Sequence, residues 1–435
     1  MALLVLGACA QNREIYPHLD RLVAAGRYDE AVAVVEKAKP EYGSTNEVLW
    51  NMDLGVFYNY AGRYQQSNEA FERAEKRIDA LFTESVSGNI LAFISNDNTL
   101  PYKGEDFESV VINIYRALNY AELGNVEAAL VEARKVDEKL KYINSQYAAN
   151  EQNGYKEDAF ARMLMGAFYE VSGTDSDLND AFISNRVATG IYDKAFYPLY
   201  RTPVPAVLKQ NLLTTAAFMG REELEQAQQK YPGIALLPEN PKRQQGQVYF
   251  VHFAGRAPVK VESGFGALMP DGNIFNIRMP KYRSVPYLIH GSRVLVDGQV
   301  TAQLEVGHPT GAIAIQGLED RIGRIRAKAI ARAVTKYMAA RVAQEEARRR
   351  GGEGLGLLTY LASNVYNVVS EQADLRAWQT LPDEILIGRV LLPPGKHKIA
   401  VQYLTGGSAV VATRDLGEVE VQAGRTRFFV LHTNT

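Results

Sequence analysis

The spacing of apolar positions changes near residue 240 of this 435-residue chain. Before that point the pattern favours helices, and after it apolar and polar positions alternate in short runs such as Val248 to Phe253, as they do in β-strands. A polar, proline-bearing stretch, Pro238 to Gln247, separates the two patterns and predicts a linker. We therefore expect a helical domain over residues 9–240 and a strand-rich domain over residues 241–435.

The strand-rich part carries several turn signals. Further strands are predicted at Ile385–Leu391, His397–Tyr403, Ala409–Thr413 and Arg427–His432. Hairpins are predicted at Asp271-Gly272, Asp297-Gly298, Pro393-Pro394-Gly395 and Ala423-Gly424. Short strands at this spacing suggest a β-sandwich-like domain.

A helical insert of about residues 317–378 interrupts these strands. In its first half, one apolar stripe recurs at helical spacing: Ile322, Ile325, Ala329, Ala333, Tyr337 and Ala340. Arg348-Arg349-Arg350 and the flexible Gly351-Gly352 end this helix, and a second apolar helix follows them. The fold class we expect is therefore α+β and multidomain, with a two-helix insert in the strand-rich domain.

The helical part contains a degenerate repeat, whose best copy is LGVFYNYAGRYQQSNEAFERA. Its spacing resembles that of a tetratricopeptide repeat (TPR), in which a small residue lets two helices approach, a glycine ends the first helix and aromatic residues fill the gap. The matching residues are Leu54, Gly55, Tyr58, Gly62, Tyr64, Phe71 and Ala74.

Weaker copies begin near Gly26, Ala117, Gly166 and Leu213, at unequal intervals. The resemblance therefore implies an irregular TPR-like α-solenoid with insertions, one of them around residues 97–105. Solenoids offer concave surfaces to extended partners. A generic helical bundle, in which glycine and tyrosine coincide by chance, is the alternative. Because the motif tyrosines serve packing, no groove residue is assigned as a site.

Composition excludes several classes of protein. Lysine plus arginine total 48 and aspartate plus glutamate 50, so the formal net charge is −2 and no global basic field exists to hold nucleic acid. No run reaches the ~18 apolar residues of a membrane-spanning helix. The single cysteine, Cys9, excludes an internal disulfide and a cysteine-based zinc cluster.

The N-terminal segment MALLVLGAC ends on that cysteine. Leu6-Gly7-Ala8-Cys9 resembles the lipobox of bacterial lipoproteins, which implies a signal peptide over residues 1–8 and acyl chains on Cys9. The segment is short and lacks a basic residue, so a truncated signal peptide is expected. The alternative is a buried cysteine near a frayed terminus. Ala10-Gln11-Asn12 has no aspartate next to the cysteine, which resembles the outer-membrane address and predicts a lipid-anchored, periplasm-facing protein.

Two pieces of the second half resemble known proteins. ADLRAWQTLPDE is similar to a signature of TPR-bearing bacterial envelope lipoproteins with no assigned activity, and LPPGKHKIAVQY resembles small extracellular sandwich modules. With the lipobox and the repeats, the first resemblance spans nearly the whole chain. A purely structural interpretation makes Trp378 and Leu381-Pro382 a helix end packed into the sandwich.

Catalytic patterns are not found in the sequence. No two of the six histidines stand four residues apart, and neither HExxH, a GxSxG elbow nor a P-loop occurs. Asp374 and Arg376 form the nearest charged pair, but two residues apart in a helix they would not face each other. We therefore expect a protein that is not an enzyme and has no cofactor, metal or catalytic residue.

Four basic residues beside the apolar stripe of the insert allow two interpretations. Arg321, Arg324, Lys328 and Arg332 recur on one side of the predicted helix. They are candidate contacts for anionic lipid or lipopolysaccharide. The simpler interpretation, which we favour, is a solvated basic face.

The function that fits these features best is assembly. We expect an outer-membrane lipoprotein whose solenoid holds an envelope protein partner, with no role for nucleic acid. Two rival functions remain open: an envelope enzyme acting on peptidoglycan or glycan, and a module that contacts lipid or lipopolysaccharide.

Overall fold

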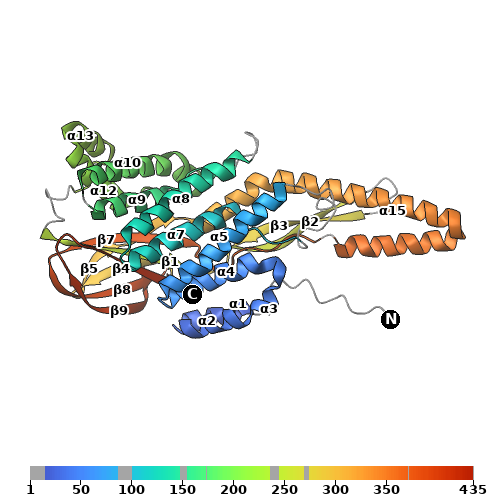
Figure 1. Ribbon diagram of the computed structural model, residues 1–435, viewed down its shortest axis with the longest axis horizontal. Coiled ribbons are helices and arrows are strands. Elements are labelled where there is room, and N and C mark those ends of the chain that lie inside the picture. The colour runs from blue at the N-terminus through green and yellow to red at the C-terminus, as the bar shows by residue number, and fades with distance from the viewer. Residues whose placement is uncertain are drawn as a thin grey trace.

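The computed structural model describes residues 15–86, 100–146, 154–172, 174–235, 244–268, 274–370 and 372–434. The predicted lipobox with Cys9, the hairpin turn at Asp271-Gly272 and most of the predicted linker lie outside the described residues. The helical first part and the sheets of the second part confirm the expected α+β class (Figure 1).

The helices of the first part form antiparallel pairs joined by short turns. Contacts between successive helices define the pairs α4/α5, α7/α8, α9/α10 and α12/α13. In chain order the helices are α1 (Ile15–Ala24), α2 (Tyr28–Lys37), α3 (Lys39–Tyr42), η1 (Ser44–Asn46), α4 (Glu47–Tyr60), α5 (Tyr64–Val86), α7 (Asp106–Glu122), α8 (Val126–Ser145), α9 (Ala159–Ser172), α10 (Asp175–Ile191), η3 (Tyr192–Phe196), α11 (Tyr197–Tyr200), α12 (Ala206–Met219) and α13 (Arg221–Lys230).

The best repeat copy forms the α4/α5 pair. A Cβ atom on Gly55 would lie 2.5 Å from the Phe71 ring, so only glycine allows this approach of the two helices. Ser67 Oγ donates a 2.7 Å hydrogen bond to the Gly55 carbonyl, which joins the helices at the same level. Gly62, at φ 70°, makes the turn between them, a conformation that costs glycine little.

The strands form two four-stranded sheets and one two-stranded ribbon. The first sheet has the order β10-β1-β7-β6, and β1 and β10 in it are parallel. The second sheet has the order β5-β4-β8-β9. The strands are β1 (Gly246–Ala254), β2 (Val259–Leu268), β3 (Ile274–Arg283), β4 (Gly291–Val296), β5 (Gln299–Gln303), β6 (Glu305–His308), β7 (Glu384–Leu392), β8 (Gly395–Leu404), β9 (Val410–Val421) and β10 (Thr426–Thr433), with β2 and β3 forming the ribbon.

The two larger sheets share an apolar core, to which Phe250 and Leu431 contribute from the first sheet and Val294 and Val401 from the second. Asp297-Gly298 makes the predicted hairpin between β4 and β5.

Two other predicted hairpins are wrong. Pro393-Pro394 joins β7 to β8 and Ala423-Gly424 joins β9 to β10, and each connection passes from one sheet to the other. These turns do reverse the chain. Strand pairing, however, follows the apolar faces that the strands bury, which turn residues do not specify.

The other face of the first sheet packs against the helices. Tyr115 of α7 stacks on Phe253 of β1 with ring centroids 4.5 Å apart, and Tyr60 of α4 stacks on His432 of β10 at 4.0 Å. Phe168 of α9 likewise contacts the first sheet, as does Asn211 of α12. The first helix of each pair therefore faces the sheet, and helices and strands share one core.

Helix α15 (Thr310–Ser370) leaves the body between β6 and β7 and returns to it. A straight helix of its 61 residues would be about 90 Å long. Instead, Ala329, Arg332 and Ala373 line one pocket, so the helical run reverses between them (Figure 1). The predicted insert of residues 317–378 thus begins earlier, at Thr310, and its helical conformation ends at Ser370.

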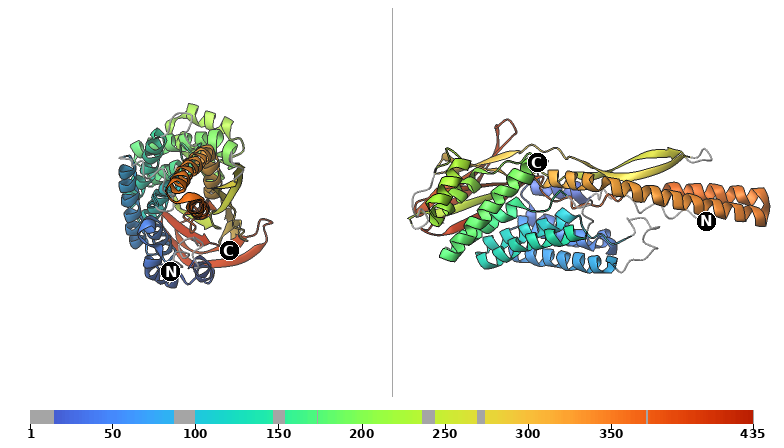
Figure 2. Two further views of the ribbon diagram at one scale, coloured as in Figure 1. Left: turned by 90° about the vertical axis from the view of Figure 1, so that its right-hand side faces the viewer. Right: turned by 90° about the horizontal axis from the view of Figure 1, so that it is seen from above.

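An arm projects from the body, formed by α15 and the β2–β3 ribbon side by side (Figure 2). Ala329 and Ala333 of the predicted apolar stripe pack against Ile277 and Met279 of β3. In the described part of the chain, no helix has both the length and the apolar character needed to cross a bilayer.

Candidate functional site

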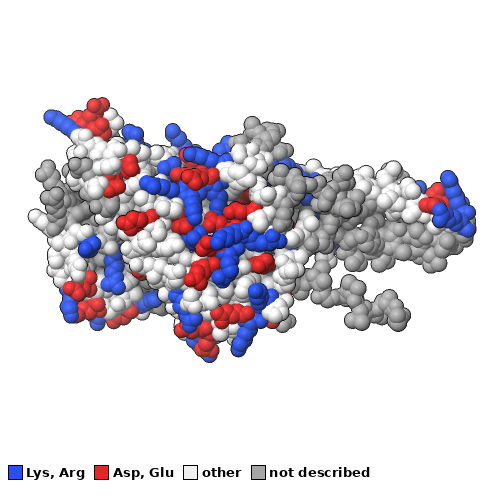
Figure 3. Space-filling model, in the orientation of Figure 1, with Lys and Arg blue, Asp and Glu red and all other residues white. Residues whose placement is uncertain are grey.

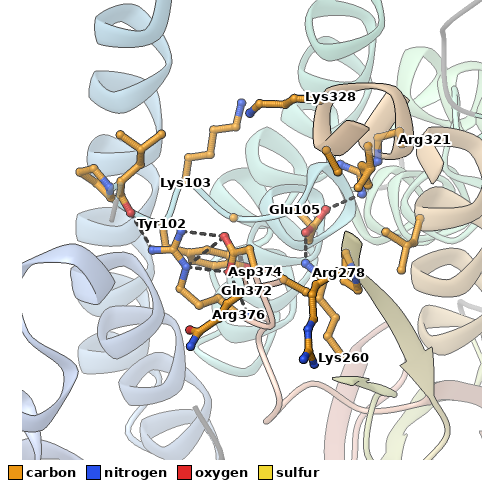
Figure 4. A pocket seen from close by; sticks show the side chains of 18 of the residues that line it. Tyr102, Lys103, Glu105, Lys260, Arg278, Arg321, Lys328, Gln372, Asp374 and Arg376 are labelled. Carbon is orange, nitrogen blue, oxygen red and sulfur yellow. Dashed lines mark hydrogen bonds and ion pairs between the residues drawn. The ribbon is translucent and has the colours of Figure 1, made fainter. Parts of the chain in front are cut away.

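A pocket of about 600 Å³ lies at the root of the arm, where four segments form its walls and Leu81 of α5 adds a contact from a fifth. The loop of residues 100–105, which precedes α7, forms one wall, and the ribbon contributes Lys260 and Arg278. Helix α15 supplies a third wall, and the extended segment of residues 372–376 supplies the fourth (Figure 4). No continuous stretch of sequence contains the pocket, so only the fold assembles it.

The described residues that line the pocket are predominantly cationic. Only two carboxylates, Glu105 and Asp374, face seven cations, an excess of five positive charges. Glu262, which pairs with Arg278 from outside the lining, reduces the excess to four. We call this site the cationic pocket, and its cations are Lys103, Lys260, Arg278, Arg321, Lys328, Arg332 and Arg376.

Glu105 organises the inner wall. Its carboxylate accepts hydrogen bonds from Lys260 and Arg321, which join the ribbon and α15 to the start of α7 (Figure 4). Burial opposes its ionisation, but the charges of Arg321 and Lys260 hold the pKa of Glu105 well below its usual range. Glu105 is also the N-cap residue of α7, where a negative charge suits the helix dipole.

Arg376 fixes the opposite wall. Its guanidinium forms a two-pronged ion pair with Asp374, with Nε–Oδ1 and Nη2–Oδ2 distances of 2.9 and 2.7 Å, and Nη1 donates to the Leu100 carbonyl at 2.7 Å. The expectation that Asp374 and Arg376 would not face each other is wrong. The segment before Trp378 is extended rather than helical, so the spacing argument for a helix does not apply.

Glu108 lies directly behind the cationic pocket and ties its walls together. One carboxylate oxygen accepts the Trp378 backbone N–H at 2.7 Å, and the other accepts the Tyr102 hydroxyl at 2.6 Å. Complete burial, with the nearby charge of Glu105, raises the pKa of Glu108 to about 7. The buried Trp378 therefore packs against the helices as well as the loop, not into the sandwich as predicted.

Two lysines stand at the mouth of the pocket. Lys103 of the loop and Lys328 of α15 point toward one another across it (Figure 4). Two ammonium groups brought close together raise the local positive potential. This part of the pocket therefore favours negative charge.

The four basic residues singled out in the sequence do not form one solvated face. Arg321, Lys328 and Arg332 all line the cationic pocket, and Arg332 is only 7% exposed. Arg324 is not among the lining residues. The sequence pattern thus identified three of the seven cations. The other four lie on distant segments that carry no common motif.

A second polar constellation lies under β6. His308 Nδ1 is 2.8 Å from Thr310 Oγ1, and His308 Nε2 is 3.1 Å from the carboxylate of Asp158. The order of hydroxyl, imidazole and carboxylate resembles a catalytic triad. All three side chains are fully buried, however, and a nucleophile needs access to substrate. The set ties α9 to the start of α15.

Opposite charges are interspersed on the helical face of the body, and basic side chains gather at the far end of the arm (Figure 3). Within the described ranges, no three histidine, cysteine or acidic side chains are grouped so as to hold a metal ion.

No family model matches the chain, and no curated protein matches its sequence. Among solved structures, BtubC from P. vanneervenii is 16% identical, with a TM-score of 0.33 over 52% of this chain and 82% of that one. MamA of MSR-1 is 14% identical, with a TM-score of 0.27 over 49% and 93%. A thermophilic TPR protein of Thermus thermophilus is 16% identical, with a TM-score of 0.22 over 50% and 91%.

Proposed function

We propose that this protein is a lipid-anchored binding protein of the bacterial envelope whose cationic pocket holds the anionic group of its partner. The excess of cations in that pocket is the observation that carries the proposal. The cations come from separated segments of the chain, and together they give the pocket a strongly positive field. Such a field favours a ligand group of negative charge.

The concave side of the helical layer does not serve this role in the proposal. In a solenoid that binds an extended partner, the inner face is open. Here the first helices of the pairs contact the chain's own sheet, through Tyr115 and Phe168 among others. The expected mode of partner binding, in a solenoid groove, is therefore replaced by binding at the cationic pocket.

The pocket suits binding better than chemistry. Glu105 is held ionised between Lys260 and Arg321, so it cannot donate a proton as a general acid near neutral pH. The Asp374 carboxylate is engaged by Arg376. An envelope enzyme acting on glycan or peptidoglycan remains the rival. Incubation of the purified protein with sacculi would release soluble fragments only under that rival.

Thermal unfolding with inorganic pyrophosphate tests the proposal. Pyrophosphate should raise the melting temperature of the wild-type protein with a saturable dose dependence, because a ligand that binds only the folded state stabilises it. The double variant Lys103→Gln/Lys328→Gln should lose most of this response. Lys396→Gln/Lys398→Gln, which removes two exposed cations of β8, is the matched control and should keep it.

Equal responses of the two double variants would contradict the proposal, since they would show that pyrophosphate acts through general surface charge. Sodium chloride at the same ionic strength should be included in every series, because salt alone screens surface charges.

Anchoring at Cys9 is the second part of the proposal. The support is the sequence of residues 6–9, because the structure describes the chain only from Ile15. Expression of the chain with its natural upstream sequence in a bacterium should give a membrane-bound protein. Mass spectrometry should find acyl chains on an N-terminal Cys9, and Cys9→Ser should release the protein. An unmodified Cys9 in wild-type membranes would refute the anchor.

Protein scaffolding through the arm is a second candidate function. Val334, Met338 and Val342 follow one another at four-residue intervals on α15 and are 46, 58 and 65% exposed. Such a stripe suits an apolar helix of another envelope protein. A photo-crosslinking residue in place of Met338 should then give one discrete product, which Val334→Gln/Val342→Gln should abolish. A smear of products in both backgrounds would contradict it.

A further inference from the structure

A second pocket, of about 180 Å³, lies where β7 begins, beside the turn that follows α11 and the start of α15. We call it the β7 pocket, and its charged lining residues are Arg201, Asp383 and Glu384. None of its described lining residues belongs to the cationic pocket. We propose that the β7 pocket binds a small molecule of about the size of alanine that carries both an ammonium and a carboxylate group. This inference is independent of the proposed function.

The β7 pocket presents one unpaired charge of each sign. In the described part of the chain, the side chains of Arg201 and Glu384 form no ion pair or hydrogen bond, either with each other or with a third residue. Lining the same small pocket without pairing, the guanidinium and the carboxylate are both open to a ligand. A molecule with charges of both signs is the complement of this arrangement.

The electrostatics of Glu384 agree with an unpaired carboxylate. Burial raises the pKa of Glu384 to about 7, and the charge of Asp383 acts in the same direction. Both causes oppose ionisation, whereas a cation close to Glu384 would favour it. The ammonium group of a ligand would supply the cation that the fold does not place there.

Asp383 adds a second carboxylate whose position is fixed. It accepts a hydrogen bond from the Tyr287 hydroxyl at 3.0 Å. The carboxylate also rests against Gly311 of α15, where a Cβ atom would collide with it. An ammonium group has three donors and benefits from two neighbouring carboxylates.

A left-handed turn places Arg201 at the β7 pocket. Helix α11 ends at this residue, which has φ 59° and ψ 26°, a conformation that is unfavourable for a residue with a Cβ atom. Its backbone N–H donates to the Tyr197 carbonyl at 3.0 Å. Backbone strain of this kind is found where the position of a side chain matters for function. A guanidinium at this place can bind a carboxylate through two parallel hydrogen bonds.

The size of the β7 pocket limits the ligand. A volume of about 180 Å³ corresponds to about six water molecules at roughly 30 Å³ each, so the pocket encloses a single amino acid of small side chain but not a peptide or a sugar. Tyr200, which is 9% exposed, also lines it, and its hydroxyl is buried without a hydrogen-bond partner among the described residues. The site therefore contains a further polar group that the fold leaves unsatisfied.

Ligands with one charged group fit less well. A simple amine would leave Arg201 unpaired, and a simple carboxylic acid would bring a third negative charge close to Asp383 and Glu384. A divalent cation would find two carboxylates and the repulsion of Arg201. Only a molecule that carries both groups satisfies both signs of charge.

Calorimetric titration of the full chain with three probes tests this inference. L-Alanine carries both groups, ethylamine lacks the carboxylate, and propionate lacks the ammonium group. L-Alanine should bind at least tenfold more tightly than either of the other two.

Two variants separate the two ends of the ligand. Arg201→Asn, chosen because asparagine tolerates the left-handed conformation, should weaken L-alanine at least tenfold and leave the weaker binding of ethylamine unchanged. Glu384→Gln should weaken L-alanine and ethylamine by similar factors. Arg283→Asn and Glu420→Gln change exposed residues outside the β7 pocket and should bind L-alanine as the wild-type protein does.

Binding should also release a proton. At pH 7 about half of the Glu384 side chains are protonated, and an ammonium group favours the ionised form, so each L-alanine should displace up to about half a proton. Titration in two buffers of different ionisation enthalpy measures this release, which Glu384→Gln should abolish. The other titratable groups around Glu384 are Asp383, Tyr200 and Arg201, with Tyr287 and His290 acting on Asp383.

Three results would overturn the inference. The first is a failure of L-alanine to bind, and the second is equal affinity for L-alanine and ethylamine, which would show that Arg201 takes no part. The third is unchanged affinity for L-alanine in Arg201→Asn, which would place the binding elsewhere. Arg201→Asn and the two singly charged probes decide the question even where Glu384→Gln lowers stability. None of these results affects the response to pyrophosphate, which tests the cationic pocket.

Discussion

Two groups of buried and half-buried charges in this protein differ in their balance. Between α5, α7 and α8, the carboxylates of Glu75 and Glu132 meet Arg116 and Lys139, with Arg116–Glu75 and Lys139–Glu75 distances of 2.6 Å. Asn113 donates to both carboxylates. This helical network is nearly neutral, whereas the cationic pocket has seven cations for two carboxylates among its described lining residues.

The difference suggests how charged side chains that stabilise the fold can be distinguished from those that are expected to bind a ligand. A balanced network satisfies its own members, so it holds three helices together and needs nothing from outside. In the cationic pocket, Glu105 and Arg376 hold the walls in place. The helical network should therefore matter for stability and not for ligands, whereas Lys103 and Lys328 of the pocket should matter for ligands and little for stability.

The largest expected effect is the loss of Arg116. Arg116→Met removes the cation that lies between Glu75 and Glu132 and leaves two buried carboxylates with less compensation, so the protein should lose about 3–5 kcal/mol of unfolding free energy. Urea unfolding measures this loss. Lys135→Gln, at the exposed rim of the same network, should cost less than about 1 kcal/mol. Equal losses for the two variants would remove the distinction between core and rim.

The second largest effect should be the weakening of the helical network by acid. Burial opposes ionisation of Glu75, but Lys139 and its hydrogen bonds lower the pKa of Glu75 to about 2 from the ordinary 4.5. The ionised Glu75 therefore adds about 3 kcal/mol to the free energy of unfolding. This stabilisation is fully present above pH 4.5 and is lost as the pH falls toward 2. Urea midpoints between pH 5 and pH 3 should show the loss.

His252 also lowers the stability of the protein as the pH falls, so a control must separate its effect from that of Glu75. Burial lowers the pKa of His252 to about 3 from 6.5, so its contribution is present above pH 6.5 and is lost as the pH falls toward 3. Glu75→Gln isolates the contribution of Glu75, because it should remove only that part of the loss of stability below pH 4.5 and leave the parts due to His252 and Glu105. An unchanged pH profile in this variant would show that Glu75 is not responsible.

A charge reversal at the mouth of the cationic pocket should raise the stability of the protein, whereas the preceding changes lower it. Lys103→Glu places a carboxylate opposite Lys328, so stability should rise by up to about 1 kcal/mol while the response to pyrophosphate disappears. Thermal unfolding with and without pyrophosphate measures both effects. A clear loss of stability would mean that Lys103 has a structural partner and that the pocket is balanced.

Salt should produce the smallest effect. Raising sodium chloride from 0.05 to 0.5 M screens the repulsion among the pocket cations. The wild-type protein should therefore gain a few tenths of a kcal/mol more than Lys103→Gln/Lys328→Gln does, as a rough expectation for exposed charges. Identical salt dependence in the two proteins would place the repulsion elsewhere.

Local patterns predicted local structure. The helices, most strands and the α15 stripe follow from periodicity, because side chains spaced to share a face must be buried together. Gly55 and Phe71 also lie where the repeat spacing places them, in close contact. Each of these features depends on residues near one another in the chain.

The site was not predictable in the same way. The repeat spacing predicts an insertion around residues 97–105 but no function for it, and in the structure Lys103 and Glu105 from this stretch line the cationic pocket. Helical spacing predicts that Asp374 and Arg376 do not face each other, but the segment that holds them is extended, so the prediction does not apply to it. Seven cations from separated segments produce no sequence motif, and their meeting depends on the tertiary packing of α7, α15 and the ribbon.

The parallel pairing of β1 with β10 has a consequence for how the chain folds after synthesis. The last strand supplies His432 to the ring of Tyr60 in α4, and Asn434 donates to Asp20 in α1. The earliest helices therefore obtain their inner neighbours only when the final residues arrive. A nascent chain that has not yet received β10 therefore cannot complete the first sheet or the inner packing of its earliest helices.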